Sequence, residues 1–453
     1  MPLDIGDYAL IGDCETAALV GRDGSIDWLC WPRFDSDACF AALLGCPDNG
    51  RWRIAPRAPA TTISRRYREG TLILETCFQT ATGGVITLVD FMPPRSDTSD
   101  LVRFVQCERG RVDVRMELVL RFGYGAIVPW VSRIDDRTLR AIAGPDMVVV
   151  HGDVEMHGED LHTVADFRLR AGESVAFSLT YCASHLPPPE PTDARQCLAE
   201  AEHFWRDWVV RTTEQGQWSE AVTRSLITLR ALIYAPTGGI VAAPTTSLPE
   251  CIGGTRNWDY RYCWLRDATM SLLSLINAGF QEEAEAWRDW LVRAAAGSPW
   301  QLQIMYGLAG ERRLAEWEVE WLPGYAGSKP VRIGNAAHAQ LQLDVYGEVM
   351  DALYQSRRGG IVGNEAAWAL QKSMLTHLER VWREPDAGIW EMRGPPRHFT
   401  HSKVMAWLAY DRAIAMTEEF GLEGPHERWR EVRGAIRADV CRHAYDAGLG
   451  HFV

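Results

Sequence analysis

Residues 256–268 form the segment of this sequence that is richest in side chains suited to binding a sugar. Four aromatic residues, three arginines and two aspartates fall within its thirteen positions. Aromatic rings supply flat apolar faces, and Arg/Asp pairs supply directed hydrogen bonds, so together they suit a polyhydroxylated ligand. Aromatic residues recur at every second position from Trp258 to Trp264. This period predicts an extended strand, with Asp259 and Arg261 on its other face.

A helix is expected to begin near Arg266, which places the carboxylate of Asp267 in its first turn. The adjacent guanidinium and carboxylate could grip sugar hydroxyls. The alternative is a helix N-terminal acid beside core aromatic residues, an arrangement that needs no ligand.

Glu391 is the candidate for acid chemistry. It follows Trp390 in a segment, residues 388–400, whose Gly and Pro residues exclude a helix over most of its length. A glutamate beside a bulky aromatic can lie in a partly apolar pocket, where desolvation raises the pKa of its carboxyl group. A glycosidic general acid needs such a retained proton. The alternative is a solvated loop glutamate paired with Arg393 or Arg397.

A third polar cluster lies in residues 310–335. Trp317 and Trp321 flank two glutamates, and Lys329 and Arg332 follow ahead of a helical pattern. The cluster could line a polar cleft with flat walls, or it could be an irregular loop anchored by tryptophans. No metal-ligand motif, phosphate-binding glycine loop or nucleophile elbow occurs, so neither a metal nor a cofactor is expected.

The elements that must position these residues change period along the chain. Up to about residue 184, short alternating runs broken by Gly, Pro and Asp predict a β-sandwich, with strands that include residues 71–78, 85–91, 114–120 and 174–181. The proline-rich residues 187–191 end this region. A linker helix is expected over residues 192–212, capped by Thr192 or Asp193.

Beyond the linker, about seven helical patterns alternate with short and long connections, which suggests helical hairpins in a toroid. The patterns cover residues 218–235, 267–278, 281–295, 335–356, 364–383, 400–420 and 425–443.

Length and charge narrow the classes of protein and partner. The 453 residues predict two domains, and a formal net charge of −13 with interspersed basic residues argues against nucleic acid as a partner. No apolar run is long enough to span a membrane, and the eleven irregularly spaced cysteines are expected to be reduced thiols. A cytoplasmic protein is expected, and oligomerisation stays open.

Taken together, these segments resemble glycoside hydrolase family 15, and most closely its bacterial trehalase-like and glucoamylase-like members. The resemblance covers nearly the whole chain and rests on five motifs that occur in the family's order. They are the N-terminal run of residues 11–36, residues 257–268, residues 329–335, Trp390-Glu391, and the helix start at 399–407 that contains Ser402-Lys403.

The resemblance implies a β-sandwich followed by an (α/α)6 toroid, with domains at 1–190 and 216–453 joined by a linker helix at 191–215. It implies inverting hydrolysis of a terminal α-linked glucose from a small-molecule α-glucoside or oligosaccharide, with trehalose favoured over glucoamylase or glucodextranase substrates. It also implies roles for six residues: Arg266 and Asp267 grip the glucose, Tyr260 and Trp264 wall the pocket, Trp390 contacts the sugar, and Glu391 is the general acid.

One departure from the family pattern concerns the general base. An inverting mechanism needs a second carboxylate about 6.5–9.5 Å from the acid. The family places that glutamate on a late loop, and we find no match for it; Glu318 or Glu320 could approach the site without any assignment. The sequence contains about seven of twelve expected barrel helices. We therefore expect a C-terminally truncated chain with weak or no hydrolysis.

Two alternatives to a hydrolase stay open. An inverting disaccharide phosphorylase would use phosphate in place of activated water, with Lys329, Arg332 or Arg397 as anion ligands. The other alternative is a non-catalytic fragment or relative that binds α-glucosides. The sequence does not decide which α-linkage is cleaved.

Overall fold

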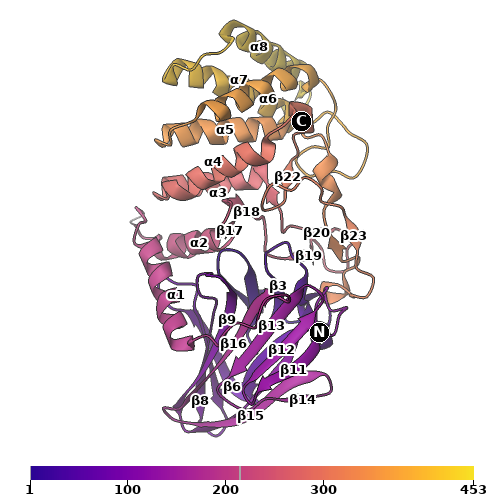
Figure 1. The fold of residues 1–453 in the computed structure, drawn as a ribbon. Coiled ribbons are helices and arrows are strands. Elements are labelled where there is room, and N and C mark those ends of the chain that lie inside the picture. The colour runs from indigo at the N-terminus through magenta and orange to yellow at the C-terminus, as the bar shows by residue number, and fades with distance from the viewer. Residues whose placement is uncertain (1, 214–215) are drawn as a thin grey trace. The chain divides into compact units, whose positions relative to one another are not determined.

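The computed structural model describes residues 2–213 and 216–453, which divide into two compact units (Figure 1). The first unit holds the N-terminal 235 residues together with residues 243–261 and 317–333. The second holds residues 236–242, 262–316 and 334–453. Strands dominate the first unit and helices the second, which confirms the predicted change from a β-rich to a helical region.

Two eight-stranded sheets, antiparallel throughout, form most of the first unit. In spatial order, the first sheet contains β1 (Tyr8–Gly12), β2 (Ala17–Gly21), β3 (Ser25–Cys30), β5 (Arg51–Pro56), β10 (Arg111–Val119), β15 (His162–Arg170) and β14 (His157–Glu159), with β4 (Ala38–Phe40) paired to β3. The second contains β11 (Trp130–Asp135), β12 (Thr138–Ala143), β13 (Asp146–Gly152), β16 (Ser174–Ala183), β9 (Ser99–Arg109), β8 (Val85–Phe91), β7 (Leu74–Thr80) and β6 (Ala60–Tyr67).

The two sheets share one hydrophobic core. Trp52 and Val114 from the first sheet and Phe78 and Leu88 from the second lie in the same cluster of buried side chains. Every second residue of a strand enters this core, because successive residues of a strand point to opposite faces. In β7, for example, Leu74, Thr76, Phe78 and Thr80 are buried while the residues between them are more accessible.

Helix α1 (Ala194–Val209) is the predicted linker helix. The Asp193 carboxylate accepts hydrogen bonds from the backbone amides of Arg195 and Gln196, so the expected cap is confirmed. Ala201 packs in a cluster with Val89 and Phe104 of the second sheet. Helix α2 (Ser219–Ala231) and strand β17 (Ile233–Tyr234) follow.

Two segments from much later in the sequence also belong to the first unit. They contain β19 (Thr246–Pro249), β20 (Asn257–Asp259), β23 (Trp317–Glu318) and β24 (Arg332–Ile333). Leu322 and Val331 join a buried cluster with Trp28 and Tyr124 of the N-terminal region. The indole Nε1 of Trp28 donates a hydrogen bond of 2.8 Å to the carbonyl of Pro244.

Six helices form the body of the second unit. They are α3 (Leu265–Asn277), α4 (Gln281–Ala295), α5 (Asp344–Arg358), α6 (Glu365–Val381), α7 (Thr400–Phe420) and α8 (His426–His443), accompanied by the short strands β18 (Gly239–Ile240), β21 (Cys263–Trp264), β22 (Met305–Tyr306), β25 (Tyr445–Asp446) and β26 (His451–Phe452).

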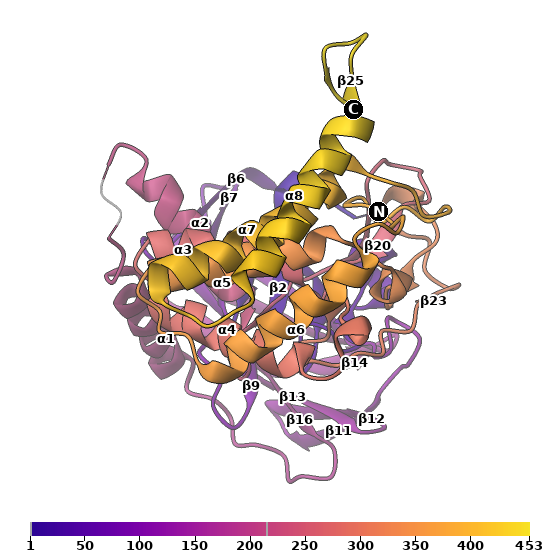
Figure 2. The ribbon, with the colours of Figure 1, turned by 90° about the horizontal axis from the view of Figure 1, so that it is seen from above.

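Figure 1 shows α3 at one end of the helical unit and α8, in yellow, at the other, and Figure 2 looks down on these helices with α8 in front. Helix α5 packs against α3 on one side and α7 on the other, while α3 also packs against α4 and α7 against α8. Hairpins of helices therefore stand side by side, as the alternating connection lengths predicted. No helix in the described ranges combines the length and the apolar character that crossing a membrane requires.

Several predicted elements differ from the structure in their bounds, and two of them differ most. The helix expected to begin at Asn335 begins at Asp344, because the Asn335 side chain caps a short 3-10 turn, Ala336–Ala339, instead. The strand expected from Trp258 to Trp264 is two strands, β20 and β21. Its break has a local cause, since the amide of Arg261 donates to the side chain of Asp259 and turns the backbone.

Candidate active site

Arg266 connects the start of α3 to the loop that carries Glu391. Its guanidinium donates hydrogen bonds to the Ile389 carbonyl at 2.8 Å and to Asp267 Oδ2 at 3.0 Å. The Nη2 atom, which donates to Asp267, also lies 3.7 Å from Glu391 Oε1. The predicted clamp pair and the predicted acid, more than 120 residues apart in sequence, thus lie in contact.

The loop holding Glu391 has a defined shape at its base and at its tip. Asp386 and Arg397 exchange backbone hydrogen bonds of 2.8 and 2.9 Å, which close the base. At the tip, the Glu391 amide donates to the Gly388 carbonyl at 3.0 Å. Glu391 has a φ of +53°, a left-handed conformation that is unfavourable for a side chain of its size.

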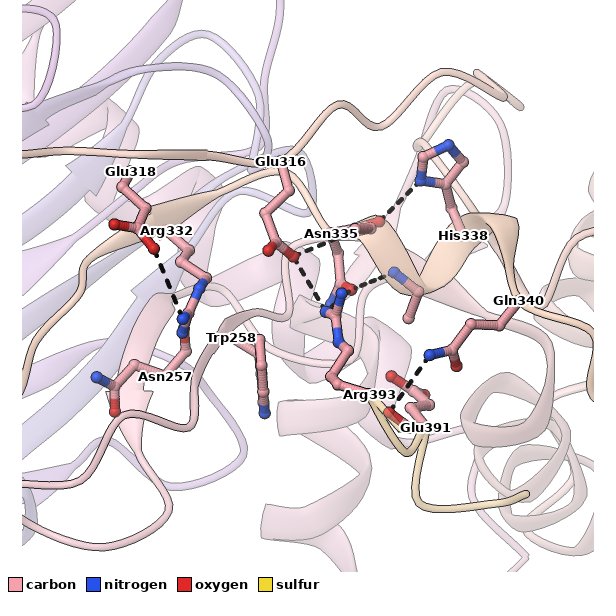
Figure 3. Close-up of polar contacts among 12 residues, drawn as sticks. Asn257, Trp258, Glu316, Glu318, Arg332, Asn335, His338, Gln340, Glu391 and Arg393 are labelled. Atoms are coloured by element: carbon pink, nitrogen blue, oxygen red, sulfur yellow. Dashed lines mark hydrogen bonds and ion pairs between the residues drawn. The ribbon is translucent and has the colours of Figure 1, made fainter. Parts of the chain in front are cut away.

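Further hydrogen bonds hold this strained turn in place. Gln340 donates through Nε2 to the Met392 carbonyl at 3.2 Å, and it also reaches the Glu391 carbonyl (Figure 3). Gly388 has a φ of +69°, and a Cβ there would lie 2.7 Å from the Phe399 ring, so only glycine fits.

The Glu391 carboxyl is shielded and has a raised pKa. Its side chain is 18% exposed. Burial is the main cause of the raised pKa, and the Asp267 charge adds to it. A hydrogen bond of 2.6 Å from Trp264 Nε1 and the charge of Arg266 act in the opposite direction without cancelling the effect. Such a carboxyl retains its proton closer to neutral pH than a solvated glutamate does.

The alternative of a solvated glutamate paired with Arg393 does not match this geometry. Arg393 instead contacts Glu316 Oε2 at 3.0 Å and Asn335 Oδ1 at 3.1 Å (Figure 3). Arg397 contributes its backbone to the base of the loop.

We expect Trp264→Phe to raise the pKa of Glu391 further. The indole donates its hydrogen bond to the carboxylate form, and loss of a donor to the charged form shifts the equilibrium toward the protonated acid. The Glu391 carboxyl resonance, followed against pH by NMR in protein labelled at glutamate, measures the change. Trp390→Phe is the control. An unchanged or lower pKa in Trp264→Phe would contradict this assignment.

Trp390 and Tyr260 are the other two predicted site residues. The Trp390 ring is 75% exposed, so it lines no closed pocket within this unit. Tyr260 belongs to the first unit, where it is partly buried and its carbonyl accepts a hydrogen bond of 3.0 Å from Ala243. The structure therefore brings together Trp264, Arg266, Asp267 and Glu391.

The third cluster, residues 317–332, lies in the first unit and has features of both alternatives, an anchored loop and a polar cleft. Trp321 donates through Nε1 to the Tyr124 carbonyl at 3.0 Å. Arg332 stacks over the Trp258 ring at 4.6 Å and lies 3.7 Å from Glu318 Oε1 (Figure 3). Glu318, Glu320, Lys329 and Arg332 nevertheless line one cavity of about 450 Å³, so part of the cluster faces open space.

Sequence reasoning missed two acidic residues on α5, Asp344 and Glu348, which face Arg266. Their spacing of four residues puts both on one helix face, and this repeat of acids at helical spacing was the available signal. In the described ranges, no group of three or more His, Cys, Asp or Glu side chains is arranged to hold a metal ion. The arrangement offers proton donation beside a guanidinium–carboxylate pair.

Comparison with known proteins identifies the class to which this site belongs. The family model described as glycosyl hydrolases family 15 matches residues 216–453, and one described as trehalase-like, N-terminal matches residues 2–205. The trehalase of Mycolicibacterium smegmatis is 36% identical over 98% of this chain and 70% of its own length. The trehalase of Thermoplasma volcanium is 30% identical over 98% of this chain and 72% of its own.

A solved structure described as a putative kojibiose phosphorylase from human microbiome aligns with 98% of this chain and 68% of its own, at 10% identity and a TM-score of 0.47.

The chain belongs to glycosyl hydrolases family 15, and it is a glycoside hydrolase.

Proposed function

We propose that this chain hydrolyses the bond to a terminal α-linked glucose with inversion at the anomeric carbon, and that trehalose is its favoured substrate. The observation that carries the proposal is the shielded Glu391 carboxyl, with its raised pKa, in contact with Arg266 beside Asp267. The relatives that are named trehalases support the choice of substrate.

In this proposal, Glu391 is the general acid. Its proton passes to the glycosidic oxygen as the bond from that oxygen to the anomeric carbon breaks, and the leaving sugar keeps the bonding electrons. Arg266 and Asp267 hold hydroxyls of the glucose, so that the bond lies within reach of the acid. Trp264 and Trp390 supply the apolar faces against the ring.

Inversion also requires a carboxylate that takes a proton from the attacking water. We assign no residue to that role in the ranges that the structure describes. For the fold, we propose a partial (α/α)6 toroid, with about seven of the twelve helices, for residues 216–453, a sandwich domain at 1–190 and a linker at 191–215. The packing of α5 between α3 and α7 supports the first of these. A cytoplasmic location is proposed from the sequence alone.

The experiment that tests this function follows trehalose by proton NMR in phosphate-free buffer. Inversion at one glucose gives β-glucose from the attacked ring and α-glucose from the leaving ring, so the first products should be equal amounts of the two anomers. Retention would give only the α anomer. Maltose, isomaltose and kojibiose should react more slowly. No glucose from any of these substrates, or glucose 1-phosphate formed only when phosphate is added, would overturn the proposal.

A further inference from the structure

Helix α5 presents two carboxyl groups to the proposed glucose site. Asp344 is its first residue and Glu348 lies one turn later, so both side chains are on the same helix face. Asp344 is fully buried, and neither of its carboxylate oxygens has a hydrogen-bond partner among the described residues. Glu348 is only partly buried. A buried carboxylate without a partner is costly, so its presence at this place calls for an explanation.

Charged groups from every neighbouring element converge on these two side chains. Asp344 interacts with Arg266 on α3, with His401 on α7, and with Asp386 at the base of the Glu391 loop. The first turns of α3, α5 and α7 therefore meet at one place.

Glu348 faces a mainly negative environment. It interacts with Asp344 and Asp351 on its own helix and with Arg266 and Asp267 on α3. Arg266 is already engaged by Asp267 at 3.0 Å and lies 3.7 Å from Glu391.

The cation nearest to Asp351 is also committed, because Arg412 pairs with Asp351 and stacks over Tyr354. Burial, followed by the charge of Asp344, raises the pKa of Glu348 to about 7, and Arg266 offsets this only in part. Near neutral pH, Glu348 can therefore present a neutral carboxyl.

We propose that Glu348 is a further substrate-binding residue, whose neutral carboxyl donates a hydrogen bond to a hydroxyl of the glucose held by Arg266 and Asp267. Asp344, buried beneath it, is a positioning residue that keeps Glu348 neutral. This inference rests on the proposed function and extends it.

The chemistry of the three groups explains what Glu348 adds. A guanidinium only donates hydrogen bonds and a carboxylate only accepts them, whereas a neutral carboxyl does both. A sugar hydroxyl also donates and accepts hydrogen bonds. A neutral carboxyl beside the Arg266 and Asp267 pair can therefore fix the orientation of that hydroxyl. Ionisation of Glu348 would remove that donor, so the affinity for glucose should fall as the pH rises through about 7.

Calorimetric titration of the full chain with D-glucose and with trehalose, from pH 5.5 to 8.5, tests the proposal. In the unmodified protein, Kd should rise with pH. Glu348→Gln keeps a neutral donor at every pH, so its Kd should stay nearly constant across the range. Glu348→Ala loses the donor, and its Kd at pH 6 should be about threefold to tenfold higher.

Asp344→Asn tests the positioning role. Loss of the neighbouring negative charge lowers the pKa of Glu348, so the rise in Kd should begin at lower pH; an unchanged pH dependence would overturn that role. Glu285→Gln, on the exposed face of α4, is the matched control and should behave like the unmodified protein.

The outcomes separate this inference from the proposed function. If Asp267→Asn abolishes glucose binding while Glu348→Ala binds as the unmodified protein does at every pH, the proposed function stands and this inference fails. If the unmodified protein binds neither sugar, both fail. If Glu348→Ala unfolds, the pH dependence of the isosteric Glu348→Gln decides.

Discussion

Glu391→Gln should lower glucose release from trehalose by about 10²- to 10⁴-fold while leaving the affinity for trehalose nearly unchanged. A glutamine amide has the shape of the protonated acid, and its oxygen can still accept the hydrogen bond from Trp264 Nε1. The loop should therefore keep its conformation. An amide has no acidic proton to transfer, so the leaving glucose would depart as an unstabilised alkoxide. Steady-state kinetics and calorimetric titration with trehalose measure the two effects separately.

A change of leaving group makes this test specific for acid catalysis. 2,4-Dinitrophenyl α-glucoside needs little protonation of its leaving oxygen, so Glu391→Gln should slow its hydrolysis far less than that of trehalose. Glu384→Gln, an exposed side chain in the same interhelical connection, is the control and should leave both rates unchanged. Equal losses on the two substrates would show that Glu391 acts in some other way than by donating a proton.

Asp259→Asn should lower the free energy of unfolding of the first unit by about 3–5 kcal/mol. Asp259 and Arg261 are both fully buried, with the guanidinium bonded to the carboxylate at 2.8 and 2.9 Å. Arg261 also donates to the Ser36 carbonyl at 2.8 Å and to Tyr124 Oη at 2.9 Å. Neutralising the aspartate removes the carboxylate that is bonded to a fully buried guanidinium, which costs much more than the loss of an exposed ion pair.

Urea denaturation followed by circular dichroism measures this loss, and a double variant gives the control. Asp259→Leu combined with Arg261→Met removes both charges at similar volume, so it should recover most of the stability. The pair would then be a structural connection between residues 257–261 and the N-terminal strands, without a part in sugar binding. A loss below about 1 kcal/mol in Asp259→Asn would contradict the importance assigned to the buried pair.

The sequence by itself determined the features that depend on neighbouring residues. The helices predicted at residues 281–295 and 400–420 have those bounds in the structure, because a period of 3.6 residues and the flanking breakers are local signals. The sequence likewise shows that Arg266 and Asp267 are adjacent and that a β-rich region precedes a helical one. The broken strand at residues 260–262 was missed because a side chain redirects the backbone there.

Only the tertiary structure decided what surrounds Glu391. Trp264, which donates to its carboxyl, lies 127 residues earlier in the chain. Asp344 and Glu348 gained a place at the site only when α5 packed against α3. Residues 243–261 and 317–333 joined the N-terminal strands by packing that no local pattern encodes. The physical reason is that a pKa, a buried charge pair and a binding wall depend on groups distant in sequence, whose proximity arises only when the chain has folded.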